Sequence, residues 1–128
     1  MNEEVILDAS ALLAFVQQEA GAEQVAASIK HAAISTVNLA EVVTKLIEGG
    51  MSESEIQDIL PALNLTIVPF DDKMAYEAGH LRTLTRKQGL SLGDRACLAT
   101  ARMRGASVLT ADRVWLKANV DVDIKCIR

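Results

Sequence analysis

The sequence predicts an α/β protein, a three-layer α/β/α sandwich around a mostly parallel central sheet. Short apolar runs alternate with stretches of helical spacing along the chain. Two of these runs also share one pattern: the run 5–7 leads directly into Asp8, and the run 108–109 leads through a short turn into Asp112. Sites in parallel sheets form at the carboxyl ends of strands. We therefore expect one acidic site along that edge.

The length and composition of the chain favour one domain of ordinary size spanning residues 1–128. The chain has 128 residues, of which 50% are hydrophobic, and it contains no evident linker, repeat or low-complexity segment. No apolar run approaches the roughly 18 residues that a membrane helix needs. No basic and apolar leader opens the sequence, so we expect a cytoplasmic protein without a membrane segment. Cys97 and Cys126 belong to no metal-binding spacing and are expected to be buried free thiols.

The first half of the chain alternates strands with helices that end at identifiable signals. The clearest helix has apolar residues at i, i+3, i+4, i+7 and i+8 and ends at Gly49 and Gly50. Ser52 and Glu55 form a capping box for the next helix, and Pro61 limits it. The expected elements are strand 5–7, helix 11–15, helix 22–30, strand 33–35, helix 39–47 and helix 52–61.

The second half follows the same alternation. Pro69 closes a strand, Asp71 or Asp72 caps a long helix, and Gly89 ends that helix. The next helix carries a small apolar stripe, and Gly105 occupies its left-handed C-cap position. The stripe consists of Leu92, Ala96, Ala99 and Met103. The expected elements are strand 65–68, a helix from 71 or 72 to 89, helix 91–104, strand 108–109, helix 114–118 and strand 123–127.

Charge is distributed unevenly along the chain. The formal net charge is −4, but residues 1–72 contain 12 acidic and two basic residues, whereas residues 73–117 contain three acidic and nine basic residues. A basic half is compatible with a polyanionic ligand, although charge alone favours solvated helix faces. Aromatic residues make up only 3% of the chain. That is too few for a base-stacking platform of the RRM kind.

Four acidic residues are expected to approach one edge of the sheet: Asp8, Glu41, Asp94 and Asp112. Each follows a strand or lies in the first turns of a helix, so each could simply cap a helix or complement its dipole. Capping, however, does not require a carboxylate, because Ser, Thr and Asn serve as well. Four carboxylates on one edge would repel one another unless a hard divalent cation bound them. The pattern therefore favours a metal site.

Four segments resemble, in order, the motifs of PIN-domain ribonucleases, and most closely those of the toxins in VapBC toxin–antitoxin pairs. The segments are 6–14, 34–42, 92–95 and 108–113. This resemblance implies that Asp8, Glu41, Asp94 and Asp112 are catalytic carboxylates that bind Mg²⁺ or Mn²⁺. It implies supporting roles for Ser10, Thr110 and Asn38. It also implies an RNA substrate, a small antitoxin partner and a homodimer.

The four motifs contain no histidine and no Ser–His or Cys–His pair, so a metal-activated water is the nucleophile that remains. By the family resemblance, cleavage would leave a 5′-phosphate and a 3′-hydroxyl. The candidates for holding the RNA backbone are Arg82, Arg86, Lys87, Arg95 and Arg113. Two alternatives stay open. A haloacid-dehalogenase-like phosphatase would need a second Asp where Ser10 stands, and a PIN-like RNA- or protein-binding module would lack activity.

Overall fold

The computed structural model describes residues 3–128 and contains a five-stranded sheet in the order β3-β2-β1-β4-β5. Every neighbouring pair is parallel, so the predicted fold class is confirmed and the sheet is wholly parallel. The strands are β1 (Val5–Leu7), β2 (Ala32–Ser35), β3 (Thr66–Val68), β4 (Ser107–Thr110) and β5 (Ile124–Cys126). Strand β1 is central, so the residues that follow it lie between those that follow β2 and β4.

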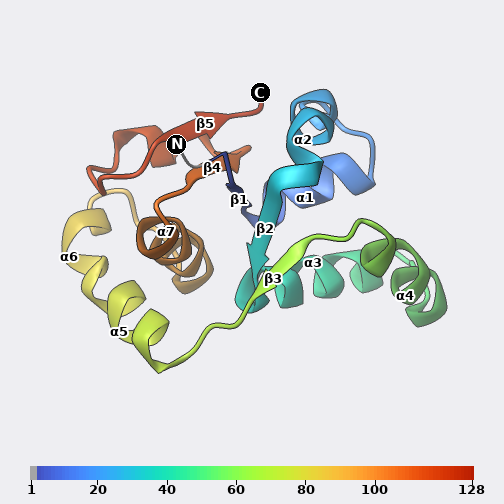
Figure 1. The fold of residues 1–128 in the computed structure, drawn as a ribbon, viewed down its shortest axis with the longest axis horizontal. Coiled ribbons are helices and arrows are strands. Elements are labelled where there is room, and N and C mark those ends of the chain that lie inside the picture. The colour runs from blue at the N-terminus through green and yellow to red at the C-terminus, as the bar shows by residue number, and fades with distance from the viewer. Residues whose placement is uncertain (1–2) are drawn as a thin grey trace.

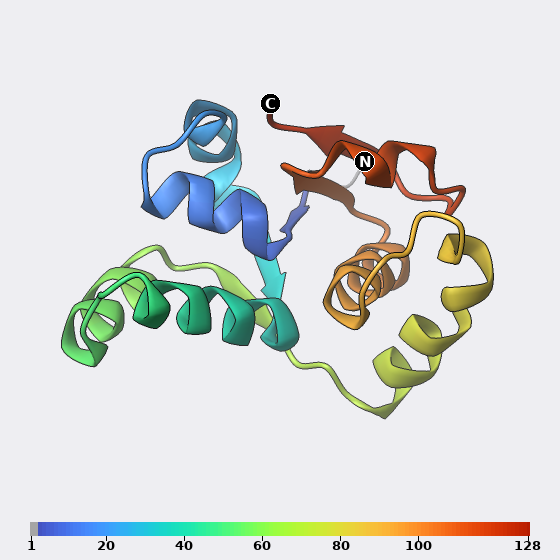
Figure 2. The ribbon, with the colours of Figure 1, turned by 180° about the vertical axis from the view of Figure 1, so that it is seen from behind.

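Helices cover both faces of the sheet, as Figures 1 and 2 show. The α-helices are α1 (Ala9–Val16), α2 (Ala22–Ser28), α3 (Thr36–Glu48), α4 (Glu53–Ala62), α5 (Asp72–His80), α6 (Arg82–Thr85) and α7 (Leu92–Arg104), and the 3₁₀ helices are η1 (Ile29–His31) and η2 (Arg113–Lys117). Side chains on β1 alternate between two hydrophobic cores. Ile6 packs with residues of α5 and α7, and Leu7 packs with residues of α1, α2 and α3. No helix within residues 3–128 is long and apolar enough to cross a membrane.

The predicted long helix that ends at Gly89 is interrupted. It divides into α5 and α6 at Leu81, and a turn carries the chain on to Gly89, whose φ of 64° is left-handed. The interruption lets both Leu81 and Leu90 enter the core, where they are 1% and 2% exposed. Pro61 lies inside the last turn of α4 rather than after it, where its missing N–H removes a single backbone bond.

Helix α7 is buried differently from the predicted stripe. Leu92 and Met103, at its two ends, are 57% and 47% exposed. The middle of the helix is buried almost all round, because α7 contacts α5, α3 and the strands β1, β2 and β4. Its buried residues are mostly small, which allows this close packing: Gly93, Ala96, Cys97, Leu98, Ala99, Thr100 and Ala101.

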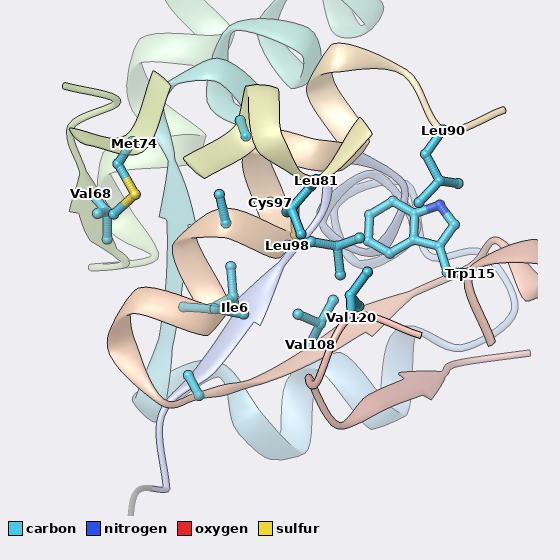
Figure 3. Packing of buried hydrophobic residues seen from close by; sticks show 14 of the residues in the cluster. Ile6, Val68, Met74, Leu81, Leu90, Cys97, Leu98, Val108, Trp115 and Val120 are labelled. Atoms are coloured by element: carbon cyan, nitrogen blue, oxygen red, sulfur yellow. The ribbon is translucent and has the colours of Figure 1, made fainter. Parts of the chain in front are cut away.

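Trp115 anchors the segment that follows β4. Its indole is fully buried and lies near Leu90, Leu98 and Val120 in the core (Figure 3). The predicted helix 114–118 is the 3₁₀ helix η2, which this tryptophan holds against the domain. Of the two thiols, Cys97 is buried as expected, but Cys126 at the end of the edge strand β5 is only half-buried.

Candidate functional site

Asp8 is the best-held carboxylate of the predicted site. It follows β1, caps α1 by accepting a 2.8 Å hydrogen bond from the Ala11 N–H, and is 5% exposed. The Ser10 hydroxyl donates to both of its oxygens, at 2.7 and 2.9 Å, and the Thr110 hydroxyl donates to Oδ2 at 2.5 Å. All three predicted residues of this group are therefore together.

The two hydroxyls connect Asp8 to the loop after β4. Ser10 Oγ accepts a 2.9 Å hydrogen bond from the Ala111 N–H, and Thr110 Oγ1 accepts a 3.0 Å bond from the Asp112 N–H. Since each hydroxyl oxygen already accepts from the backbone, its own proton is directed to the carboxylate. The orientation of the Asp8 side chain thus depends on the main chain of two strands.

Burial raises the pKa of Asp8 from 3.8 to about 6. The hydrogen bonds from Thr110, Ala11 and Ser10 oppose this shift, and the negative charge of Asp94 adds to it. The raised pKa means that desolvation outweighs three hydrogen bonds. A charged Asp8 at neutral pH therefore costs folding energy, which a bound cation would offset.

Glu41 and Asn38 form a second group at the start of α3. Asn38 is 1% exposed, and its Nδ2 donates to Glu41 Oε1 at 2.8 Å and to the Gly93 carbonyl at 2.9 Å. These two bonds use both hydrogens of the amide and connect α3 to the first turn of α7. Within residues 3–128, Asn38 Oδ1 has no hydrogen-bond partner.

Asp94 has the structural role that the capping interpretation assigned to it. Its Oδ2 accepts a 2.9 Å bond from the Ser91 N–H, and Ser91 Oγ accepts a 3.1 Å bond from the Asp94 N–H, which completes a capping box for α7. The capping does not exclude a role in the site, because its charge acts on the pKa of Asp8. Asp112 likewise caps η2, with Oδ1 accepting from the Val114 N–H at 3.0 Å.

Two thiols have pKa values that burial and carboxylate charges raise. Burial raises the pKa of Cys97 well above its usual value, and the charges of Asp8, Asp94 and Glu41 raise it further. Burial also raises the pKa of Cys126, where Arg113 opposes the shift and Asp112 and Asp8 add to it. The charge of Asp8 therefore acts on both thiols.

The chemistry of this acidic group fits a hard divalent cation. All of its donors are oxygen atoms, which Mg²⁺ and Mn²⁺ prefer. Glu41 Oε2, Asp94 Oδ1 and Asp112 Oδ2 accept no hydrogen bond from residues 3–128. In the same residues, no three Asp, Glu, His or Cys side chains are grouped closely enough to hold a metal as they stand. Binding would therefore require exposed side chains such as that of Asp112 to rotate.

The predicted RNA-binding residues differ in their environments. Arg82, Arg86 and Lys87 are exposed on and just after α6, and Arg113 is exposed on η2. The Gln88 side chain donates a 3.2 Å bond to the Lys117 carbonyl, which joins these two segments. Arg95 is half-buried, and its Nη1 donates a 3.0 Å bond to the Ala78 carbonyl. That contact holds α7 to α5, so the RNA-binding role of Arg95 stays a prediction.

Gly93 is the residue that sequence reasoning missed. It lies in the first turn of α7, and the Glu41 carboxylate lies where a Cβ atom of this residue would be. The available signal was a glycine inside a helical pattern, where it is a poor helix former and commonly has a packing reason.

The fold and the match to a family model place this chain in the PIN domain family. The model of that family matches residues 5–120, so the family prediction from the four motifs is confirmed. Comparison with curated protein sequences gives no match.

Similar solved structures come from toxin–antitoxin complexes. A complex from Klebsiella pneumoniae has a chain with a TM-score of 0.74 at 18% identity, and DNA-bound VapBC from Salmonella typhimurium has one with a TM-score of 0.76 at 17% identity. VapBC-5 from Mycobacterium tuberculosis gives a TM-score of 0.65 at 22% identity. Each comparison covers 98% of both chains. At these identities, the similarity establishes a common fold.

Proposed function

We propose that this chain is a metal-dependent endoribonuclease and the toxin of a toxin–antitoxin pair. The observation that carries the proposal is the buried Asp8 carboxylate, whose pKa is raised to about 6 and which neighbours the charge of Asp94. A carboxylate kept in such an environment at a sheet edge is typical of a functional site. The PIN domain fold and the toxin–antitoxin origin of its structural neighbours support the same conclusion.

In this proposal, Asp8, Glu41, Asp94 and Asp112 hold Mg²⁺ or Mn²⁺ through their oxygens. When bound, such an ion lowers the pKa of a water and stabilises negative charge on the phosphate. Ser10 and Thr110 orient the Asp8 carboxylate, as their hydrogen bonds indicate. The product expected from the family resemblance has a 5′-phosphate and a 3′-hydroxyl.

The substrate-holding role falls to exposed basic residues near the start of α7. Arg86 and Lys87 are exposed, and the contact between Gln88 and Lys117 brings their segment beside η2, which carries Arg113. Together these cations provide a positive surface for a phosphate backbone. Arg82, on α6, is exposed on the same segment.

The docking surface proposed for the antitoxin lies along α3 and α4. A groove of about 420 Å³ lies between α3, α4 and β3, and its apolar lining includes Leu39, Val43, Ile56, Leu60, Leu65 and Ile67. The same two helices carry the acidic residues Glu41, Glu48, Glu53, Glu55 and Asp58 and the single base Lys45. An amphipathic segment with basic residues on one side complements this surface. A homodimer is also proposed, from the family resemblance alone.

Purified protein incubated with mixed RNAs tests the function. We expect cleavage in Mg²⁺ or Mn²⁺ and none in EDTA, and we expect co-expression with the product of a short adjacent reading frame to suppress it. Cleavage that persists in EDTA would contradict the carboxylate mechanism. Metal-independent binding of RNA without cleavage would instead support the inactive binding module. The Asp8→Asn variant, in which the buried charge is removed, is the control for contaminating nucleases.

A further inference from the structure

Gly93 occupies a position where glycine is not needed for backbone conformation. It lies in the first turn of α7, and its φ is not left-handed. It is also buried, so an apolar side chain would gain burial energy there. Glycine is the poorest helix former after proline. Its presence therefore requires a packing reason.

That reason is the Glu41 carboxylate. A Cβ atom on Gly93 would lie 2.6 Å from Glu41 Oε2, 2.7 Å from Oε1 and 2.8 Å from Cδ, and these are its nearest atoms outside its chain neighbours and the backbone of its own helix. All three distances are shorter than real Cβ contacts. The Glu41 carboxylate thus occupies the space that a side chain at position 93 would fill. Any larger residue at position 93 would force Glu41 to move.

Asn38 fixes the carboxylate within that space. Its Nδ2 bonds at once to Glu41 Oε1 and to the carbonyl of Gly93 itself, at 2.8 and 2.9 Å. Glu41 is otherwise an exposed side chain with several rotatable bonds, so these contacts reduce its conformational freedom before any ligand binds. The other oxygen, Oε2, has no hydrogen-bond donor among residues 3–128.

We propose that Gly93 is a positioning residue of the metal site: its missing side chain forms the seat for the Glu41 carboxylate, while Asn38 holds one carboxylate oxygen and leaves the other for the cation. This inference rests on the metal-dependent function proposed above. Gly93 itself supplies no ligand and acts only through Glu41. Its neighbour in sequence, Asp94, is a separate proposed ligand.

Melting temperatures measured in EDTA test the contact between Gly93 and the Glu41 carboxylate in the absence of metal. The matched control is Gly79→Ala, because Gly79 also lies in a helix, but a Cβ atom there would meet nothing within 4 Å apart from its chain neighbours and the backbone of its own helix. There, alanine should raise the melting temperature by about 1–4 °C through helix propensity. Gly93→Ala should give no such gain, because alanine displaces Glu41. In a Glu41→Ala background, the same Gly93→Ala change should raise the melting temperature.

Mn²⁺ affinity, measured by calorimetry, tests the link to the metal. Gly93→Ala should weaken binding about tenfold, as is typical when a residue that orients a ligand is changed. Gly79→Ala should bind as wild type does. Glu41→Asp, which shortens the side chain, should weaken binding in the wild-type background but cost less, or restore affinity, beside Gly93→Ala.

The outcomes separate the two proposals. Gly93→Ala that gains stability like Gly79→Ala and binds Mn²⁺ normally would overturn the positioning role. An equal loss from Glu41→Asp in both backgrounds would overturn it as well. A wild-type protein that does not bind Mn²⁺ would overturn the proposed function and the metal part of this inference. The melting-temperature cycle would still decide the contact between Gly93 and Glu41.

Discussion

The Thr110 hydroxyl donates a 2.5 Å hydrogen bond to Asp8 Oδ2 and at the same time accepts one from the Asp112 N–H. One side chain at the end of β4 thus connects the buried carboxylate after β1 to the backbone of a second proposed ligand. The positions of Asp8 and Asp112 are therefore coupled through the sheet. Changes at Thr110 should alter both stability and the protonation of Asp8.

Thr110→Val should destabilise the protein by about 1–3 kcal/mol, because it keeps the shape but removes the shorter of the two hydrogen bonds to Asp8 Oδ2 and leaves the Asp112 N–H without a partner. It should also raise the pKa of Asp8 further, since the Thr110 bond lowers that pKa. Urea unfolding at several pH values measures both effects.

The matched control is Thr100→Val. Thr100 is equally buried, but its hydroxyl donates only to the Ala96 carbonyl inside α7. Because that carbonyl belongs to a helix, the loss should be smaller. Equal destabilisation by the two changes would show that the hydrogen bond to Asp8 contributes no more to stability than the one inside α7.

The raised pKa of Asp8 predicts a stability that falls as pH rises. Its folded pKa of about 6 exceeds the unfolded value of 3.8, so the folded state binds more protons between these values. The stabilisation from this group is fully present below about pH 4 and is lost as pH rises through 6. The full shift corresponds to about 3 kcal/mol, as an upper limit.

Asp8→Asn isolates this effect, because asparagine caps a helix as well as aspartate does. In EDTA, the variant should match the wild type near pH 4 and be more stable at pH 7. The pKa of Glu4 is lowered by its hydrogen bond with Arg104, so its contribution to stability increases with pH, but it is present in both proteins. Parallel stability curves from pH 4 to 7 would contradict a buried Asp8 with a raised pKa.

The group around Asp8 could be predicted from the sequence, whereas the contact between the Glu41 carboxylate and Gly93 could not. Strand ends in a parallel sheet meet at one edge, so Asp8 was expected there, and the family resemblance added Ser10 and Thr110 as its supporting hydroxyls. The contact between Glu41 and Gly93 depends on how α3 packs against α7, which no local pattern encodes. The raised pKa of Asp8 likewise depends on burial by residues far away in the sequence.

The errors in the predicted elements have similar causes. The helix expected to reach Gly89 breaks at Leu81, because two leucines on either side of the turn enter the core. Helical periodicity indicated an apolar stripe on α7, but the neighbouring helices bury its middle from several sides. Local sequence therefore located the elements well, whereas tertiary packing decided their ends and faces.

The exposed basic residues after α6 should hold the RNA backbone. Replacing Arg86 and Lys87 together by glutamine should reduce the slope of log K against log salt by about 1.4 if each contacts one phosphate of single-stranded RNA. Filter binding in EDTA at several salt concentrations measures the slope without cleavage.

The control replaces Lys30 and Lys125, which are also exposed, with the same change in net charge. Lys30 lies in η1, just before β2 begins. It is therefore at the amino-terminal ends of the parallel strands, whereas Asp8 is at their carboxyl ends. Replacing these two lysines should leave the slope of log K against log salt close to that of the wild type. A slope that falls equally in both variants would reflect total charge, and an unchanged slope would assign Arg86 and Lys87 to a solvated face.

Asp94→Asn separates the capping role of this residue from its proposed metal role. Asparagine can still accept the 2.9 Å bond from the Ser91 N–H. The matched control is Asp71→Asn, because Asp71 caps α5 through a 3.0 Å bond to the Met74 N–H. In EDTA, each change should cost about 0.3–1 kcal/mol through the helix dipole. The cost at Asp94 should be the smaller, because its charge also opposes ionisation of Asp8.

Mg²⁺ should then distinguish the two variants. A cation that binds only the folded state at ten times its Kd stabilises it by about 1.4 kcal/mol, and a tenfold weaker Kd reduces this gain to about 0.4 kcal/mol. Wild type and Asp71→Asn should show the full gain in melting experiments, whereas Asp94→Asn should show the reduced one and lose most RNA cleavage. If all three proteins gained equally from Mg²⁺, Asp94 would be a helix cap and not a ligand.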